Sequence, residues 1–167
     1  MCAVKIAVCS DIHDNLHALE LMLAEIGKAD CLVFCGDLNA PFTFKALVDG
    51  FRGPVHTVWG NNDGDRWYIG HLAHQVSNVT LHGEFAELEL DGYRIAITHY
   101  PRIAWAVAHA DLYDLVCYGH DHQKHHERIG ETMLLNPGEL MGRFGPPSYA
   151  IVDSITADVV IRELTAR

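Results

Sequence analysis

Residues of metal-ligand type follow five short apolar runs in this 167-residue sequence. The set consists of Asp11, His13, Asp37, Asn61, His99, His120 and His122. Two carboxylates, one amide and four imidazoles, without a thiolate, suit Mn, Fe, Co, Ni or Zn better than Ca or a structural zinc. Seven ligands are too many for one such ion. A bridging carboxylate would let them hold two divalent ions about 3.5 to 4 Å apart, the separation used for displacement at phosphorus.

Each group taken alone has a simpler explanation. An aspartate after a strand most often caps a helix or forms a turn, and Asn61 in GNND suits a turn with positive φ. A solitary His99 would more often be a hydrogen-bonded core or surface residue. The pair of His120 and His122 does not by itself separate a metal site from a surface patch. The joint occurrence after five runs is what favours a metal centre.

The apolar runs that precede these residues have the length and composition of buried strands. They span residues 4–9, 31–35, 55–59, 94–98 and 115–118. Apolar residues recur at helical spacing over 16–26, with Asp14 or Asn15 available as N-cap and Gly27 as stop. Residues 43–51 and 66–73 are expected to form short helices. Because sites in open α/β sheets assemble outside the carboxyl ends of the strands, residues remote in sequence would converge there.

The second half of the sequence has the pattern of hairpins. Asp91 and Gly92 form a two-residue turn within FAELELDGYRIAIT. Pairing across it places apolar side chains opposite one another: Leu90 and Tyr93, Leu88 and Ile95, Ala86 and Ile97. A meander of 148–153 and 158–164 closes the chain. A parallel-type first half and an antiparallel second half predict an α/β (α+β) protein of two packed sheets with helices outside.

Composition indicates one soluble globular domain over residues 1–167, with 49% hydrophobic and 20% charged residues. No apolar run approaches the roughly 18 residues of a membrane span, and no signal peptide is expected, so a cytoplasmic location is predicted. A net charge of -10 disfavours long nucleic acid as a partner. There is no Cys-x-x-Cys pair, and four of the five cysteines lie within apolar runs. We expect reduced, buried thiols at Cys9, Cys31, Cys35 and Cys117.

The motifs, in their order and approximate spacing, resemble those of the calcineurin-like metallophosphoesterase superfamily. They are Asp11-Ile12-His13, Gly36-Asp37, Gly60-Asn61-Asn62-Asp63, His99 and Gly119-His120-Asp121-His122. The small single-domain bacterial and archaeal phosphodiesterase branch is the most similar, and NPGE at 136–139 is similar to a further family segment. The resemblance implies a four-layer αββα sandwich, with two mixed β-sheets flanked by helices.

It also implies how the ligands are shared between two ions. One metal would be held by Asp11, His13, Asp37 and His122. The other would be held by Asp37, Asn61, His99 and His120. A hydroxide shared by the two ions, with Mn as the expected metal, would attack the phosphorus of a small or nucleotide-derived phosphodiester. Relatives of this size often self-associate, so a homo-oligomer is expected by analogy.

Two positions depart from the family pattern. Many members have histidine where this sequence has Asn62, and an amide can donate a hydrogen bond to a phosphoryl oxygen but cannot supply a proton. This replacement favours diesters or activated leaving groups over general phosphomonoesterase activity. Tyr100 stands where the family often has glycine, and its ring either narrows the site or packs outside it. Asp63 and Asp121 are expected either to orient imidazoles or to be solvated loop carboxylates.

Two other functions stay open from the sequence. A catalytically weak, metal-bound binding scaffold, like the retromer-associated relatives of this fold, is consistent with the missing histidine, whereas the complete ligand set argues against it. A phosphomonoesterase or nuclease is the third interpretation, and the net charge makes long nucleic acid the weaker substrate. In CYGHDHQKHH, only His120 and His122 are expected to bind metal, with His125 and His126 on the surface.

Overall fold

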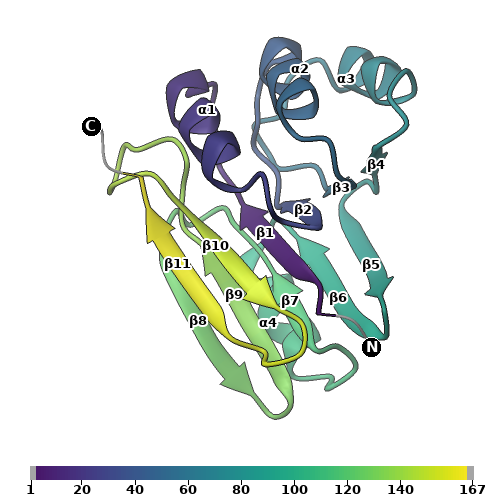
Figure 1. The fold of residues 1–167 in the computed structure, drawn as a ribbon, viewed down its shortest axis with the longest axis vertical. Helices are drawn as coiled ribbons and strands as arrows, with labels where there is room; N and C mark the ends of the chain where they lie inside the picture. Colours follow the sequence, from purple (N-terminus) through teal and green to yellow (C-terminus); the bar gives the residue numbers. More distant parts are fainter. Residues whose placement is uncertain (1–2, 165–167) are drawn as a thin grey trace.

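Two β-sheets packed face to face form the centre of the protein, which is described by a computed structural model over residues 3–164 (Figure 1). The first sheet has the order β11 (Val159–Glu163), β10 (Ser148–Asp153), β1 (Lys5–Cys9), β2 (Cys31–Phe34), β3 (Val55–Thr57) and β4 (Val79–Leu81). The second has the order β5 (Phe85–Leu90), β6 (Tyr93–Thr98), β7 (Leu115–Cys117), β9 (Thr132–Pro137) and β8 (Lys124–Ile129). The helices are α1 (Leu16–Glu25), α2 (Pro41–Gly50), α3 (Arg66–Ala73) and α4 (Pro101–Ala108).

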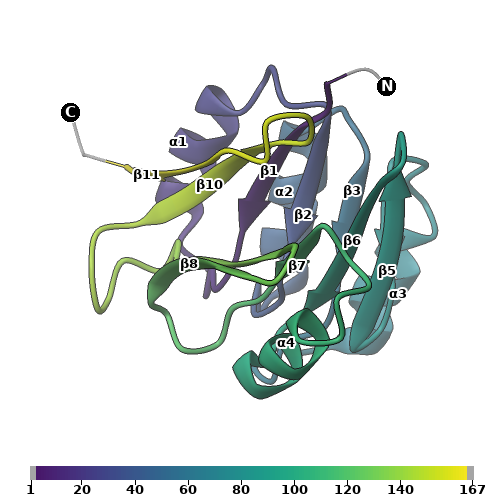
Figure 2. The same cartoon turned by 90° about the horizontal axis from the view of Figure 1, so that it is seen from below.

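Three apolar clusters separate the layers. Ile6 and Val33 of the first sheet pack against Ile95 of the second, between the two sheets. The outer face of the first sheet is covered by α1, α2 and α3, and the outer face of the second by α4 (Figure 2). The predicted four-layer αββα arrangement of two mixed sheets is therefore confirmed. One of its outer layers consists of α4 alone among the described residues.

The first half of the chain folds as its pattern predicts. The Asn15 side chain caps α1 by accepting a hydrogen bond from the Ala18 amide at 3.1 Å, so Asn15 rather than Asp14 is the N-cap. Helix α2 begins two residues before the predicted start because Pro41 occupies the first turn, where a missing N–H costs nothing. Helix α3 has the predicted bounds. Strands β1, β2 and β3 are parallel neighbours, so their carboxyl ends lie at one edge.

The second half agrees with prediction in its hairpins and differs in its central strands. Strands β5 and β6 pair across the Asp91–Gly92 turn in the predicted register, and β10 pairs with β11. The expectation of an antiparallel second half is wrong for β6, β7 and β9, which run parallel. The physical reason for the β6–β7 pair is α4, an unpredicted crossover helix that returns the chain to the same end of the sheet. Between β7 and β9 the chain returns through β8, which pairs antiparallel with β9.

Four cysteines are buried, as expected from their positions in apolar runs. Cys9, Cys31, Cys35 and Cys117 are free and buried, and burial raises the pKa of the Cys31 thiol to about 12. The fifth cysteine, Cys2, lies outside the described residues. Within residues 3–164, no helix combines the length and apolar character needed to cross a membrane.

Candidate metal centre

All seven predicted ligands converge at one end of the two sheets. Strands β1, β2, β3, β6 and β7 each lead into a loop that carries one or two of them. The backbone N–H of His120, which follows a strand of the second sheet, donates to Asp11 Oδ2 at 3.0 Å, directly linking the strand ends of the two sheets. The convergence expected from strand-end positions is thus present in the structure.

The first half of the cluster contains Asp11, His13, Asp37 and His122. His13 Nε2 lies 3.7 Å from Asp11 Oδ1 and 3.5 Å from Asp37 Oδ2. His122 Nε2 lies 3.4 Å from Asp11 Oδ1, and the His13 and His122 rings stack with centroids 5.1 Å apart. Ligand atoms of Asp11, His13 and His122 all lie within 4.8 Å of one another. With metal–ligand bonds of about 2.0–2.2 Å, this spacing fits donors around one ion.

The second half contains Asp37, Asn61, His99 and His120. Asn61 Oδ1 lies 2.7 Å from His120 Nδ1 and 3.1 Å from His99 Nε2. His99 Nε2 is also 3.3 Å from His120 Nδ1 and 3.4 Å from Asp37 Oδ2. His99 is completely buried, whereas Asn61 and His120 are exposed, so this half of the cluster opens to solvent.

Buried polar atoms in the cluster test whether the residues fit divalent ions. Asp11 Oδ1 and His13 Nε2 are both buried, and neither has a hydrogen-bond partner among the described residues. A buried polar atom without a partner is costly, about 1–3 kcal/mol. Both atoms point into the cluster beside a second carboxylate and a second imidazole. A divalent cation would satisfy them, and the oxygen and nitrogen donors match transition-metal chemistry.

The charges of the cluster shift the titration of its members. The adjacent Asp11 carboxylate holds the pKa of His13 above its usual value. Burial would lower the pKa of His99, but its contact with Asp37 outweighs burial and raises it. Burial would likewise raise the pKa of Asp37, but His99 and the hydrogen bonds from Asn62 hold it below its usual range. Asp37 therefore carries a full negative charge at neutral pH.

Backbone strain is concentrated in the ligand loops. Positive φ angles occur at Asp11 (52°), His13 (43°), Asp37 (64°), His120 (74°) and His122 (62°). A residue in the left-handed region costs about 1–3 kcal/mol unless the surroundings impose it, and such strain gathers at functional sites. Five of the seven residues of the cluster thus have a strained backbone.

Two motif glycines permit the close approach of the loops. A Cβ at Gly60 would lie 2.1 Å from Asp37 Oδ1, and one at Gly119 would lie 1.9 Å from Ser10 Oγ and 2.6 Å from Asp11 Oδ2. These distances are impossible for carbon and oxygen atoms that are not bonded. The glycines before Asn61 and His120 are thus required by packing against Asp37 and against Ser10 and Asp11.

Hydrogen bonds behind the cluster fix the orientation of its members. His99 Nδ1 lies 2.8 Å from the Cys35 carbonyl and can only donate to it, which leaves Nε2 free for a metal. Asp63 neither orients an imidazole nor is solvated. It is buried and accepts backbone N–H groups of Asp37, Leu38, Asn39 and Gly60 at 2.7–3.2 Å. One carboxylate therefore ties the loop after β2 to the loop after β3.

Asp121 has a similar structural role on the other sheet. Its Oδ1 accepts from Asn136 Nδ2 at 2.7 Å and from the Gln123 N–H at 3.1 Å, so it holds the loop after β7 against β9. His125 and His126 lie on β8, away from the cluster, and His125 Nδ1 is 3.1 Å from the Tyr118 hydroxyl.

The two positions that depart from the family pattern lie at the rim of the cluster. The Asn62 N–H and Nδ2 donate to the two Asp37 oxygens at 2.7 and 2.8 Å. The half-buried Tyr100 ring lies 5.3 Å from the His99 ring and 5.5 Å from the His120 ring. Tyr100 therefore borders the cluster and narrows its open side.

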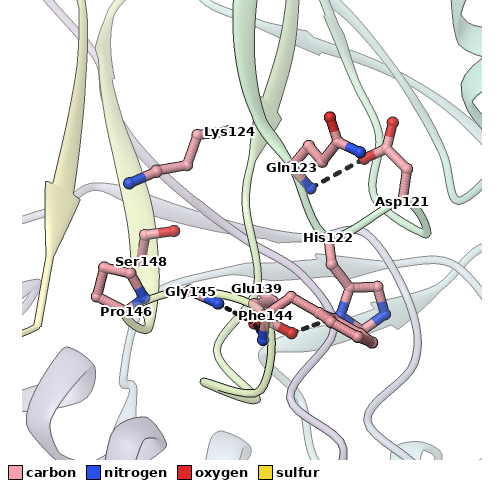
Figure 3. Close-up of a pocket in the computed structure, with 9 residues that line it drawn as sticks. All are labelled: Asp121, His122, Gln123, Lys124, Glu139, Phe144, Gly145, Pro146 and Ser148. Atoms are coloured by element: carbon pink, nitrogen blue, oxygen red, sulfur yellow. Dashed lines mark hydrogen bonds and ion pairs between the residues drawn. The ribbon is translucent and has the colours of Figure 1, made fainter.

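Glu139 is a residue of the site that the sequence interpretation missed. It is 2% exposed, and its Oε2 lies 2.5 Å from His122 Nδ1. Its Oε1 accepts the N–H groups of Phe144 and Gly145 at 2.5 and 3.1 Å. Figure 3 shows the carboxylate between the imidazole and the Phe144 loop. The sequence did contain a signal, because NPGE adds a carboxylate directly after a strand.

A two-sheet sandwich with such a cluster at its strand ends defines the class of metal-dependent phosphoesterases. The profile of the calcineurin-like phosphoesterase superfamily domain matches residues 4–157, so the chain belongs to this superfamily and is a hydrolase of phosphate esters. The superfamily implies divalent metal ions, and the donor set described above fits them.

Individual relatives agree with this assignment. The chain is 28% identical over 158 residues to Phosphodiesterase MJ0936 of Methanocaldococcus jannaschii, covering 90% of this chain and 93% of the relative. A solved structure of an archaeal phosphodiesterase superposes with a TM-score of 0.89 at 26% identity, covering 96% of this chain and all of the other. Vacuolar Protein Sorting 29 from Cryptosporidium parvum shares the fold, with a TM-score of 0.67 at 15% identity and coverage of 98% and 99%.

Proposed function

We propose that the protein is a dinuclear metal-dependent phosphodiesterase, formed by a single domain over residues 1–167. The observation that carries this proposal is the position of Asp37 Oδ2, 3.5 Å from His13 Nε2 and 3.4 Å from His99 Nε2. One carboxylate oxygen thus lies between the two halves of the cluster, as a bridging ligand must. The name of the archaeal relative supports diesters as the substrate class.

The ligands divide between two ions in this proposal, with Asp37 shared. The first ion is held by Asp11, His13, Asp37 and His122, and the second by Asp37, Asn61, His99 and His120. Two such ions, with Mn preferred over Fe, Ni, Co or Zn, would supply Lewis acidity that activates water and neutralises phosphoryl charge. The protein contributes the fixed imidazole orientations described above and excludes water from the buried side of the cluster.

Asn62 sets the preference for diesters. Its backbone N–H and Nδ2 already face the ligand cluster, and an amide there can hydrogen-bond a phosphoryl oxygen. It cannot donate a proton to a leaving alkoxide at neutral pH. Substrates with good leaving groups should therefore react, and simple alkyl monoesters should react slowly.

Three further expectations accompany this function. The substrate is a small or nucleotide-derived diester, since the charge of -10 opposes the binding of long nucleic acid. The four free buried thiols support a reducing, cytoplasmic location. Exposed aromatic side chains on α3 and α4, Trp67 (79%) and Trp105 (55%), support self-association, which light scattering on the purified protein would measure.

The test is an assay of Mn-loaded protein whose metal content has been measured. We expect hydrolysis of bis(p-nitrophenyl) phosphate to exceed that of p-nitrophenyl phosphate, with two ions bound per chain. Asp37→Ala should lose both metal and activity, whereas the exposed control Glu131→Gln should lose neither. Protein that binds two ions per chain and hydrolyses neither ester would refute the proposal and favour a binding scaffold.

A further inference from the structure

A cavity of about 610 Å³ opens directly beside the metal-ligand cluster. Its walls come from the loop after β7 with the first residue of β8, and from the loop between β9 and β10 with the first residue of β10. His122 belongs to both the cavity and the cluster (Figure 3). The volume lies within the range of small-molecule sites, about 300–1,000 Å³. It is much larger than a phosphoryl group needs, so it can hold an organic group attached to the phosphorus.

One wall of the cavity is the solvent-exposed aromatic ring of Phe144. Phe144 is 72% exposed, and its ring meets the His122 ring edge-on at 5.3 Å between centroids. The Arg143 guanidinium lies 5.4 Å from the centroid of the same ring. The ring contributes little to the core, but a planar ligand can stack on it.

Glu139 fixes this wall relative to the metal cluster. The same buried carboxylate contacts His122 through Oε2 and the N–H groups of Phe144 and Gly145 through Oε1. A group stacked on Phe144 would therefore sit at a set position from the ions that His122 helps to hold. Such preorganisation lowers the entropic cost of binding.

The charge of the cavity limits what it can accept. Asp121 and Glu139 line it with carboxylates, and its one lysine, Lys124, is already paired with Glu163. The Arg143 guanidinium lies against the Phe144 ring but is not part of the lining, so the groups that line the cavity carry more negative than positive charge. An anionic substituent would be repelled, and so would the negative charge that develops on a departing oxygen. The cavity therefore suits a neutral or cationic group that stays on the phosphorus.

We propose that this cavity binds the retained ester group of the substrate, and that the group is planar, aromatic and not negatively charged, such as an aryl or nucleoside group. This specificity rests on the proposed diesterase function. Dialkyl diesters lack a planar retained group, and a monoester substrate has no retained group because its one organic group leaves. Both would gain little from the cavity, and a diester with a further phosphate on the retained group would be repelled by it.

Two diesters that share one leaving group test the proposal. Bis(p-nitrophenyl) phosphate and methyl p-nitrophenyl phosphate both release p-nitrophenolate and differ only in the retained group. Wild-type protein should have a lower KM for the aryl diester, and Phe144→Ala should raise that KM about five- to tenfold, the size expected for one stacking contact. The methyl diester should keep its KM. An equal change for both substrates would overturn the proposal, because Phe144 would then act on the leaving group or on the metal site.

Product binding, measured by calorimetry on Mn-loaded protein, separates this proposal from the catalytic one. Wild-type protein should bind phenyl phosphate about five- to tenfold tighter than methyl phosphate, and Phe144→Ala should remove the difference. Equal wild-type affinities would overturn the cavity proposal even if hydrolysis occurs. A normal preference for phenyl phosphate in protein without hydrolysis would retain the cavity and reject the diesterase.

Two further comparisons check the chemistry of the site. Phe144→Trp should keep the preference for the aromatic product and Phe144→Leu should lose it, since leucine keeps bulk without a planar face. 4-Carboxyphenyl phosphate should bind more weakly than phenyl phosphate, and tighter binding would contradict the acidic lining. Ile155→Ala truncates another exposed apolar side chain (59%), in the turn between β10 and β11 and outside the cavity lining, and it should change none of these values.

Discussion

Replacement of Glu139 by glutamine changes one oxygen of a buried carboxylate to an NH₂ group and removes its charge. Both oxygens of Glu139 are used, one by His122 and the other by the N–H groups of Phe144 and Gly145. Glutamine has only one oxygen, so one end of the side chain must be mismatched. The substitution thus tests whether the charge and the two acceptor oxygens of the side chain are required, because glutamine keeps only its shape.

Each orientation of the glutamine has a definite cost. If its NH₂ faces the backbone N–H groups, buried donors lose their acceptor, which costs about 1–3 kcal/mol. At 2–4 °C per kcal/mol for a protein of this size, Tm should fall by about 2–12 °C. If the NH₂ instead faces His122 Nδ1, that nitrogen must accept, and its proton moves to Nε2, the atom that faces Asp11. Binding of an ion through His122 Nε2 should then weaken about 10- to 100-fold.

Calorimetric titration of metal-free protein with Mn measures both effects when it is combined with thermal unfolding. We expect the ion held by Asp11, His13 and His122 to bind more weakly in Glu139→Gln, with a smaller change at the Asn61, His99 and His120 half. Glu131→Gln, an exposed acid on the turn between β8 and β9, is the matched control and should be unchanged. Wild-type values for both metal affinities and for Tm in Glu139→Gln would refute the reasoning.

Three other predictions follow from the site and its supports. Asp63→Asn places an NH₂ group against backbone donors, so Tm should fall by about 2–12 °C, and an unchanged Tm would contradict the anchoring role. Asn62→His should keep both metals and raise kcat for an alkyl monoester such as glycerol 2-phosphate at least about tenfold, because imidazole can donate a proton to a poor leaving group; an unchanged ratio of diester to alkyl-monoester turnover would contradict this account. His56 and His82 face each other at 3.0 Å, and burial lowers the pKa of both below 6.5. The unfolded chain then binds protons more readily, so stability present above about pH 6.5 should decrease as the pH falls below it. Thermal unfolding from pH 8 to 5 should show a shallower decrease for His82→Gln than for wild type, and equal slopes would refute this origin.

The local sequence pattern was sufficient to predict most of the strands and turns that surround the cluster. Strand-end position predicted the convergence of all seven candidate ligands because parallel strands bring their carboxyl ends to one edge, whatever the details of their loops. The hairpin at Asp91 was predictable because turn chemistry and alternation agree in one register. Strand β8 was not predictable, since its sequence KHHERI is polar except for Ile129 and its burial pattern does not alternate. Helix α4 was missed although Pro101 at its first turn is a start signal.

The roles of the supporting carboxylates depend on contacts that no local pattern encodes. Asp63 and Glu139 both lie in recognisable motifs. Each carboxylate, however, acts by accepting backbone N–H groups from residues outside its own motif. The loop bound by Asp63 lies 24–26 residues before it, and the one bound by Glu139 begins only five residues after it. The loop bound by Asp63 contains two strained residues, Asp37 and Asn39, with positive φ values of 64° and 79°. A buried carboxylate that accepts several N–H groups holds such strain in place, because releasing the loop would leave a buried charge without partners. The same reasoning explains why glutamine at Glu139 should be a more damaging change than its near-identical shape implies.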